Sequence, residues 1–448
     1  MKLSRFCKLI SLNGKFKAII NCLNRAIVEL SPDKASVLEK MYDNVSSLAL
    51  LDDESLNLLK TTGLVLEDSV DEIDLFRRWF ENIKLDTSII KAVVLLTSRC
   101  NLGCTYCFED GYIKNRQLDM DRETASRIIN WLHKFAKKHK SKEMKVYFYG
   151  GEPTLNPEML EFFPEELICA TSREGITPEF YMYTNGTILN DHLIKVLENY
   201  KFKYLQITLD GPPEIHNKRR PFKTGKRSYK VIHKNINRIL RDTNSKVLLL
   251  INFDLQNYQA LPSFLDEISE FKDQNFAIAF SPVFETKCNL EHCNNYRLPS
   301  KQYYHIWADL LKIAARKGFS CNPIRIFDKG PCTFWRLSHL VFDPLGNIYK
   351  CIGMPGMEEY KIGNVSQGFS PDLIERIYKY IEMTPWDNDE CRKCAYLPLC
   401  LGGCRLHCVM ENGNITDTFC HKELIENCEI EMIRDLISRK MTIEGSIE

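Results

Sequence analysis

The sequence lacks an excess of charge of either sign. Its 60 lysine and arginine residues nearly equal its 59 aspartate and glutamate residues, so the formal net charge of the 448-residue chain is +1 at pH 7. A chain without a net charge has no general attraction for nucleic acid or for an anionic membrane. We therefore expect neither of them as a partner.

Long apolar runs are also missing. The start of the chain, Met1 to Cys7, does not contain the uninterrupted apolar stretch of a signal peptide. No later run is long enough to span a bilayer. We expect a cytoplasmic protein, long enough to bury the cores of more than one domain.

Cysteine, in contrast, is plentiful, with 18 residues. The cytoplasm keeps thiols reduced, so this number favours metal ligands over disulfides. Three cysteines lie within residues 100–107, and ten lie within residues 321–428. We expect metal sites in these two regions.

The first region is a C-x3-C-x2-C triplet of Cys100, Cys104 and Cys107, which follows an apolar run at residues 91–97. A cubane iron–sulfur cluster takes four thiolates, so three on one loop leave one iron open for a small molecule. A zinc loop or three incidental cysteines could share this spacing. The spacing alone therefore does not decide between them.

Three further motifs follow the triplet, and each of them closes an apolar run. They are Tyr149-Gly150-Gly151-Glu152-Pro153-Thr154, Tyr183-Thr184-Asn185-Gly186-Thr187 and Thr208-Leu209-Asp210-Gly211. A triplet with all three motifs in order argues against a metal-free loop. In these residues the chain resembles the radical S-adenosylmethionine (SAM) superfamily.

The resemblance implies a site for SAM and a reaction. SAM would be held by Tyr106, Gly150, Gly151, Glu152, Pro153, Thr184, Asn185, Thr208, Asp210 and Asn252. Reduced flavodoxin or ferredoxin would supply an electron through a [4Fe-4S] cluster, which cleaves SAM to methionine and a 5′-deoxyadenosyl radical that abstracts hydrogen from the substrate. Asn185-Gly186 and Asp210-Gly211 are also good turn formers, so a turn-only role stays open for each.

Strand-like and helix-like segments alternate in the middle of the chain. The predicted strands are residues 91–97, 145–149, 179–184, 204–209, 246–253 and 276–280, and the predicted helices are 121–138, 157–168, 191–200, 229–241 and 261–271. This alternation predicts an α/β fold with a parallel sheet. The resemblance implies a partial (β/α)6 TIM-like radical SAM barrel in a core domain of residues 91–300. The motifs fall at the carboxyl ends of the strands, where such barrels place reactive groups.

The second cysteine-rich region has its own order of ligands. Cys332, Gly346 and Cys351 precede Cys391-x2-Cys394-x5-Cys400-x3-Cys404 and Cys420, an order that resembles the SPASM domain, here residues 321–430. The resemblance implies two auxiliary [4Fe-4S] clusters, hence three in total. The outer one would use Cys391, Cys394, Cys400 and Cys420, and the inner one Cys332, Cys351 and Cys404. Cys321 is an open candidate for the fourth inner ligand, and a zinc ribbon at residues 391–404 is the rival interpretation.

The first 85 residues carry no catalytic motif. Strand candidates at residues 6–12, 16–20 and 26–30 precede helices near 34–42, 53–61 and 71–82. This plan resembles the winged-helix-like module (RRE-like) that recognises leader peptides, although a plain capping subdomain has the same elements. A leader would add as a strand to the sheet edge.

Together these features predict a radical SAM/SPASM maturase of a ribosomally synthesised precursor peptide, which forms a thioether or carbon–carbon crosslink. The alternative is an anaerobic sulfatase-maturating enzyme, which makes formylglycine. That group places an aspartate directly after the cysteine matching Cys351, where this chain has Ile352. A non-catalytic peptide-binding scaffold is a third possibility, which the intact triplet opposes. We expect Arg219 and Arg220 to belong to a solvated basic loop, and the sequence identifies no general base.

Overall fold

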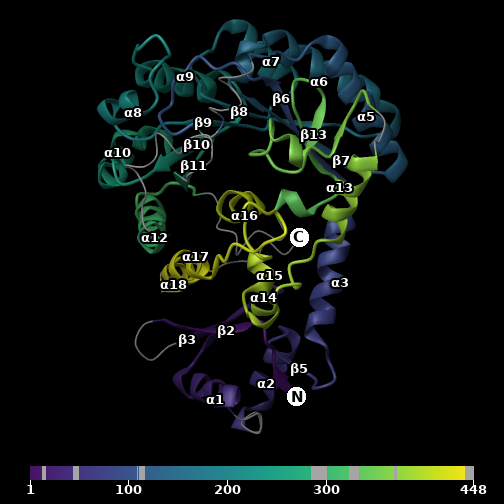
Figure 1. The fold of residues 1–448 in the computed structure, drawn as a ribbon. Coiled ribbons are helices and arrows are strands. Elements are labelled where there is room, and N and C mark those ends of the chain that lie inside the picture. The colour runs from purple at the N-terminus through teal and green to yellow at the C-terminus, as the bar shows by residue number, and fades with distance from the viewer. Residues whose placement is uncertain are drawn as a thin grey trace. The chain divides into compact units, whose positions relative to one another are not determined.

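The computed structural model describes residues 1–12, 17–43, 50–107, 109, 117–283, 300–321, 332–367 and 371–438. The chain forms two compact units (Figure 1). The first unit combines Met1–Ile83 with Met383–Glu448, and the second combines Lys84–Asn322 with Cys332–Glu382. In the described part of the chain, no helix is long and apolar enough to cross a membrane.

The second unit is built on a nine-stranded sheet in the order β11-β10-β9-β8-β7-β6-β12-β13-β14. Its first six strands pair in parallel. They are β6 (Ile89–Thr97), β7 (Glu143–Gly150), β8 (Glu179–Thr184), β9 (Tyr204–Thr208), β10 (Lys246–Phe253) and β11 (Phe276–Pro282). This sheet confirms the predicted α/β class and its mostly parallel strands.

Helices connect the parallel strands, as parallel pairing requires. They are α5 (Arg122–His139), α6 (Pro157–Thr171), α7 (Asp191–Asn199), α8 (Pro213–Arg219), α9 (Tyr229–Asp242) and α10 (Leu261–Glu267), and α12 (Ser300–Arg316) follows β11. Burial alternates along β7, where Val146 and Phe148 are buried and Tyr147 and Tyr149 are partly exposed. Phe148 packs on Phe163 of α6, with ring centroids 5.6 Å apart. The helices therefore cover the fully apolar face of the sheet.

Three strands that the sequence did not predict extend the sheet beyond β6. Strand β12 (His339–Phe342) pairs in parallel with β6, and β13 (Asn347–Tyr349) and β14 (Gly363–Asn364) continue in antiparallel pairing. Gly346 forms the turn between β12 and β13 with φ +75°, and a Cβ there would lie 2.5 Å from Val365 Cγ2. Both the backbone conformation and the close contact require glycine at this position.

The first unit has a smaller antiparallel sheet of β2 (Cys7–Ser11), β3 (Lys17–Asn21) and β4 (Ile27–Leu30). Helices α1 (Pro32–Asp43) and α2 (Asp53–Thr61) pack on it around a core that includes Ile19, Leu38 and Leu59. Strands β1 (Lys2–Leu3) and β5 (Val65–Leu66) pair with each other. The three predicted strands and the first two predicted helices are thus present, and the β1–β5 pair adds to the predicted plan.

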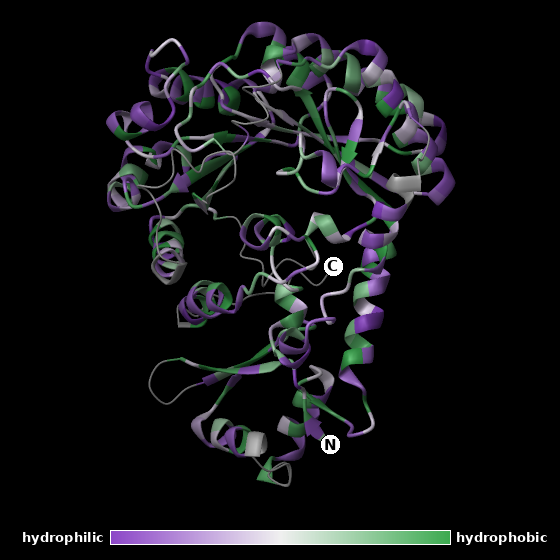
Figure 2. Cartoon of the chain, viewed as in Figure 1, coloured by the Kyte–Doolittle hydropathy of each residue, from purple (hydrophilic) through white to green (hydrophobic). Residues whose placement is uncertain are grey.

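The carboxyl-terminal part of the chain completes the first unit. It contains α14 (Asp389–Lys393), α15 (Leu397–Cys400), α16 (Arg405–Asn412), α17 (Lys422–Leu424) and α18 (Ile430–Ser438). Trp386 packs edge-on against Phe76 and Phe80 of α3 (Glu72–Leu85), at 5.6 and 5.3 Å between ring centroids. Hydrophobic and hydrophilic residues alternate along α3 in Figure 2, as in an amphipathic helix. The aromatic residues of α3 therefore tie residues from both ends of the chain into one core.

Candidate active site

The three cysteines of the triplet lie on the loop that follows β6. Burial raises the pKa of each thiol, to about 12 for Cys100, and neighbouring thiols of the triplet add to the rise for Cys100 and Cys107. Because their pKa values are raised, these thiols lose their protons only at a cost in free energy, and metal binding requires that loss. The positive charge of bound iron would offset this cost. The donor set therefore fits an iron–sulfur cluster.

Backbone hydrogen bonds fix the cluster loop to the segment that follows α8. The Gly103 amide donates to the Pro221 carbonyl at 2.8 Å, and the Thr105 amide donates to the Arg219 carbonyl at 2.9 Å. In the opposite direction, the Lys223 amide donates to the Asn101 carbonyl at 2.9 Å. Two segments that are far apart in sequence thus hold the cysteines in place.

The two glycines after β7 lie directly against the start of the cluster loop. A Cβ on Gly150 would be 2.2 Å from the Thr97 carbonyl oxygen, and a Cβ on Gly151 would be 2.2 Å from the Arg99 carbonyl oxygen. The Gly151 amide donates to the Thr97 carbonyl at 2.9 Å, and the Glu152 amide donates to the Arg99 carbonyl at 2.7 Å. Only glycine allows this approach.

This approach gives a prediction for the cluster. Gly151→Ala should displace the backbone at Arg99 and lower the iron bound at the triplet by more than half, because backbone atoms cannot move aside as a flexible side chain can. Iron analysis after anaerobic reconstitution measures the effect. Gly103→Ala, in the cluster loop itself, is the matched control, since its Cβ would meet nothing closer than 4.0 Å. Equal iron in the two variants would contradict this account.

Glu152 connects the ends of β7 and β8. Its side chain is fully buried, and its Oε1 accepts hydrogen bonds from Thr154 Oγ1 at 2.6 Å and Thr184 Oγ1 at 2.7 Å. Its Oε2 accepts from the Asn185 amide at 2.6 Å. Burial raises the pKa of Glu152, and these donors oppose the rise. Glu152 and Thr184 are thus bonded to each other, while the buried Pro153 follows in the same turn.

Asn185 lies next to the cluster loop. Its Nδ2 donates to Asn101 Oδ1 at 2.8 Å and lies 3.8 Å from Cys100 Sγ. Its Oδ1 accepts from the Thr187 amide at 2.9 Å. Asn185 therefore contacts both its own turn and a cysteine of the triplet, which is more than the turn-only role requires.

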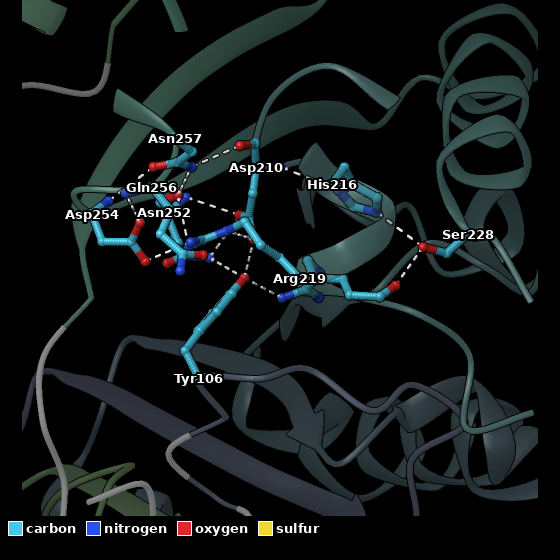
Figure 3. A network of polar contacts seen from close by, with 10 residues as sticks. Tyr106, Asp210, His216, Arg219, Ser228, Asn252, Asp254, Gln256 and Asn257 are labelled. Atoms are coloured by element: carbon cyan, nitrogen blue, oxygen red, sulfur yellow. Dashed lines mark hydrogen bonds and ion pairs between the residues drawn. The ribbon is translucent and has the colours of Figure 1, made fainter. Parts of the chain in front are cut away.

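A second polar network surrounds Asp210, which follows β9 (Figure 3). Asp210 is fully buried and accepts hydrogen bonds from the Tyr106 hydroxyl and, at Oδ1, from the Asn252 amide at 3.1 Å. The Asn252 Nδ2 donates to the Tyr106 hydroxyl at 3.1 Å. Three of the predicted SAM contacts, from three separate segments, are therefore hydrogen-bonded together. Thr208, at the end of the same strand, is buried as well.

Arg219 and Arg220 are part of this network and not of a solvated basic loop, so that expectation is wrong. Arg219 is 3% exposed, and its guanidinium forms ion pairs with Asp210 at 3.4 Å and with Asp254. Arg220 donates to the Tyr106 hydroxyl at 2.8 Å. Burial alone would raise the pKa of Asp210, but Arg219 and then Arg220 hold it below its usual value. The carboxylate thus stays ionised inside the protein.

His216 supports the same turn in its neutral form. It is fully buried, its Nδ1 accepts from the Asp210 amide at 3.2 Å, and its Nε2 lies 3.0 Å from Ser228 Oγ. Burial lowers the pKa of His216 to about 3. No role was predicted for this residue, or for Asp254 and Asn257. Asp254 pairs with Arg219, and Asn257 Nδ2 donates to the Asp210 carbonyl at 2.7 Å, contacts that only the folded chain brings about.

The four cysteines of the predicted outer site all belong to the first unit. Burial raises the pKa of Cys400 to about 12, and Cys420, Cys391 and Cys394 raise it further through their proximity. Burial also raises the pKa of Cys391, and the proximity of Cys420 and Cys394 raises it further. These four thiols thus lie near one another.

The cysteines of the predicted inner site are divided between the units. Cys332 lies close enough to Lys350 to affect its pKa, and Lys350 directly precedes Cys351. The backbone of Cys321 forms an isolated β-bridge with Ile278 of β11 in the same unit. Cys404 belongs to the first unit.

Comparison with known proteins identifies the central domain. Residues 94–268 match the family model described as the Radical SAM superfamily. The chain contains a radical SAM domain and is an enzyme. A radical SAM enzyme binds SAM at a [4Fe-4S] cluster, and the matched region contains the triplet, the glycine turn and the Asp210 network.

Relatives of this radical SAM enzyme include a sulfatase-maturating enzyme and a cyclopropyl synthase. A cysteine-type anaerobic sulfatase-maturating enzyme of Clostridium perfringens is 24% identical over 332 residues, which cover 69% of this chain and 86% of that protein. The radical SAM cyclopropyl synthase TigE of Paramaledivibacter caminithermalis is 22% identical and covers 92% of this chain and 88% of that protein. Both similarities extend well beyond residues 94–268.

Among solved structures, the radical SAM enzyme resembles Streptococcus suis SuiB bound to the precursor peptide SuiA. The TM-score is 0.53 at 14% identity, and the match covers 94% of this chain and 99% of SuiB. At this identity the likeness is one of fold, and it includes the first unit.

Proposed function

We propose that this radical SAM enzyme modifies a ribosomally synthesised peptide by forming a thioether or carbon–carbon crosslink. The observation that carries the proposal is the extent of similarity: a cyclopropyl synthase and a peptide-bound enzyme each match more than nine-tenths of the chain. A cyclopropyl ring is itself a product of carbon–carbon bond formation. The domains of the proposal are residues 1–85, 91–300 and 321–430.

The cofactors of the proposal are SAM and three [4Fe-4S] clusters. Cys100, Cys104 and Cys107 would hold the SAM cluster, which cleaves SAM reductively when bound. Around it, Gly150 and Gly151 present backbone groups, and the Tyr106–Asp210–Asn252 network offers polar groups to the nucleoside. The chain's own work is to orient SAM and to exclude water from the radical. Reduced flavodoxin or ferredoxin is the proposed electron donor.

The remaining ligands belong to the SPASM region. Cys391, Cys394, Cys400 and Cys420 would hold the outer cluster, which their mutual proximity supports. Cys332, Cys351 and Cys404 would hold the inner cluster, with Cys321 as the candidate fourth ligand. These clusters would accept the electron that is released when the substrate radical is oxidised.

Sulfatase maturation is the second candidate function, because a sulfatase-maturating enzyme is 24% identical over 69% of this chain. Two features favour the peptide proposal over it. Ile352 follows Cys351 in place of the aspartate of that family, and the cyclopropyl synthase and SuiB match 92% and 94% of this chain, against 69% for the sulfatase-maturating enzyme.

The small sheet of the first unit offers an edge for the leader of the peptide. Among the described strands, none pairs with the outer side of β4. The Asn21 amide donates to the Ala26 carbonyl at 2.9 Å. Because hydrogen-bonded positions alternate along an antiparallel strand, Val28 and Leu30 also hydrogen-bond to β3, while the amides of Ile27 and Glu29 point outward. An extended leader could hydrogen-bond to Ile27 and Glu29.

This edge gives a direct test of the leader site. Glu29→Pro removes an outward amide without removing a β3–β4 hydrogen bond, and proline is tolerated at such edge positions. We expect it to reduce peptide binding at least about tenfold, the effect of losing about 1.4 kcal/mol of hydrogen bonding. Fluorescence anisotropy with a labelled precursor peptide measures the binding, and Glu29→Ala, which keeps the amide, should bind normally.

Uncoupled formation of 5′-deoxyadenosine should stay unchanged in Glu29→Pro. Such a point change is a sharper test than removal of residues 1–85, because α3 packs on Trp386 and truncation would uncover that core. Normal peptide binding by Glu29→Pro would exclude β4 as the leader site.

A further inference from the structure

Three basic residues from the first 25 positions of the chain contact one short segment, residues 391–400, which includes the end of α14 and all of α15. Arg5 donates from Nη2 to the Arg392 carbonyl at 2.6 Å. The Lys8 ammonium lies 5.7 Å from the ring centroid of Tyr396. Arg25 donates from Nη2 to the Pro398 carbonyl at 3.3 Å. All these residues belong to the first unit.

The contacted segment is the one that carries most of the proposed outer-cluster ligands. Arg392 lies between Cys391 and Cys394, and Tyr396 and Pro398 lie between Cys394 and Cys400. Each cation therefore touches the backbone or an aromatic ring within five residues of a proposed ligand. The contacts begin on three different parts of the small sheet: the turn before β2, β2 itself and the β3–β4 turn.

Cys22 gives independent evidence that the small sheet reaches the cluster site. It follows β3 and is fully buried. Burial raises its pKa to about 12, Arg25 opposes the rise, and Cys394 adds to it through proximity. A proposed cluster ligand thus lies beside the end of β3.

The position of Arg25 is itself fixed. Its residue has φ +69° in the turn, and its guanidinium also donates to the carbonyls of Cys22 and Leu23, the latter at 3.4 Å. Acidic groups lie near as well, since Glu426 bonds to Tyr396 and Glu429 lies close to Cys22. Arg25 and Lys8 both lower the pKa of Cys22 and so offset part of this negative charge.

Nearby charge matters to an iron–sulfur cluster because reduction adds a negative charge to it. Net charge, hydrogen bonds and solvent exposure set the reduction potential of such clusters, and groups outside the ligand shell also hold the ligands in place. Cations stabilise the reduced form through space. Their removal should make the cluster harder to reduce.

We propose that Arg5, Lys8 and Arg25 are positioning residues of the outer auxiliary cluster, which fix its ligand segment and raise its reduction potential. This inference rests on the proposed cluster at Cys391, Cys394, Cys400 and Cys420. It gives the amino-terminal module a second task besides peptide recognition. The module keeps the cluster able to accept an electron from the substrate radical.

The test is an EPR-monitored redox titration of the full-length chain with Cys100, Cys104 and Cys107 changed to alanine, so that only auxiliary clusters contribute. In the combined variant Arg5→Gln, Lys8→Met and Arg25→Gln, we expect the oxidised-to-reduced ratio of one cluster at a fixed potential to rise about tenfold. For one electron this corresponds to about 59 mV. Each single variant should give a smaller shift in the same direction.

Two controls separate charge from folding. Arg25→Lys keeps the charge and should shift the ratio less than Arg25→Gln does. Arg78→Gln removes a cation of the same unit whose side chain is 74% exposed and forms an ion pair with Asp74, and it should shift nothing. An unchanged ratio in the combined variant with unchanged iron content would overturn the inference, and the single variants decide the matter if the combined variant loses iron.

The cluster assignment has its own measurement. Cys400→Ala in the same background should lose the iron of one cluster and one EPR signal. Retention of both would mean that the outer cluster itself is misassigned, which is a failure of the proposed function and not of the role of the cations.

Discussion

Replacing Cys104 with alanine is expected to abolish the formation of 5′-deoxyadenosine. The triplet offers only three thiolates, and its loop lies within the matched radical SAM region. With one ligand missing, an iron of the cluster loses its anchor, and SAM can no longer be reduced at that site. We expect the rate to fall by at least about 10³-fold, since enzymes commonly accelerate reactions by 10⁶-fold or more.

Chromatography of the nucleoside under anaerobic, reducing conditions measures this loss. Cys169→Ala is the matched control, because Cys169 is an exposed thiol of the same unit outside every proposed ligand set. The control should retain both its iron and its nucleoside formation. Continued 5′-deoxyadenosine production by Cys104→Ala would remove the triplet from the reaction.

The second large effect concerns stability. Arg219→Met should lower the free energy of unfolding of the second unit by about 3–5 kcal/mol, because it leaves two buried carboxylates without their cation. The side chains of Asp210 and Asp254 are 0% and 2% exposed, so water cannot replace the guanidinium. The loss should appear as a lower midpoint in thermal or urea unfolding.

Lys218→Met is the control for this prediction, since Lys218 is the exposed neighbour of Arg219 on the same helix. Its unfolding midpoint should match that of the parent. Adding Asp254→Asn to Arg219→Met should restore part of the lost stability, because one of the two unpaired charges is then gone. A change of less than about 1 kcal/mol in Arg219→Met would show that the pair is not buried as described.

The parallel core of the fold could be predicted because its elements are regular. Strands β8 and β10 begin and end at the predicted residues, and helix α2 agrees with its predicted bounds. Here apolar periodicity and turn residues report the same boundaries. The glycine turn and the triplet were also visible, since each is a contiguous motif.

Other features depend on contacts between distant segments. Strand β12 joins the sheet beside β6 although more than two hundred residues separate them, and no local pattern indicates such pairing. The sequence around Arg219 is typical of a surface arginine. Its burial depends on the ion pair with Asp254, which lies on a distant segment. The packing of Trp386 on α3 likewise joins residues from the two ends of the chain.

If this radical SAM enzyme crosslinks a ribosomally made peptide, the mass of that peptide changes. The measurement is the intact and fragment mass of a short peptide encoded beside the gene, after anaerobic co-expression with the enzyme. We expect a loss of two hydrogens per event, with fragmentation suppressed between the two joined residues. An unchanged peptide mass in both normal and heavy water would contradict it and favour a sulfatase-type protein substrate, whereas deuterium gain in heavy water alone would mean epimerisation instead of crosslinking.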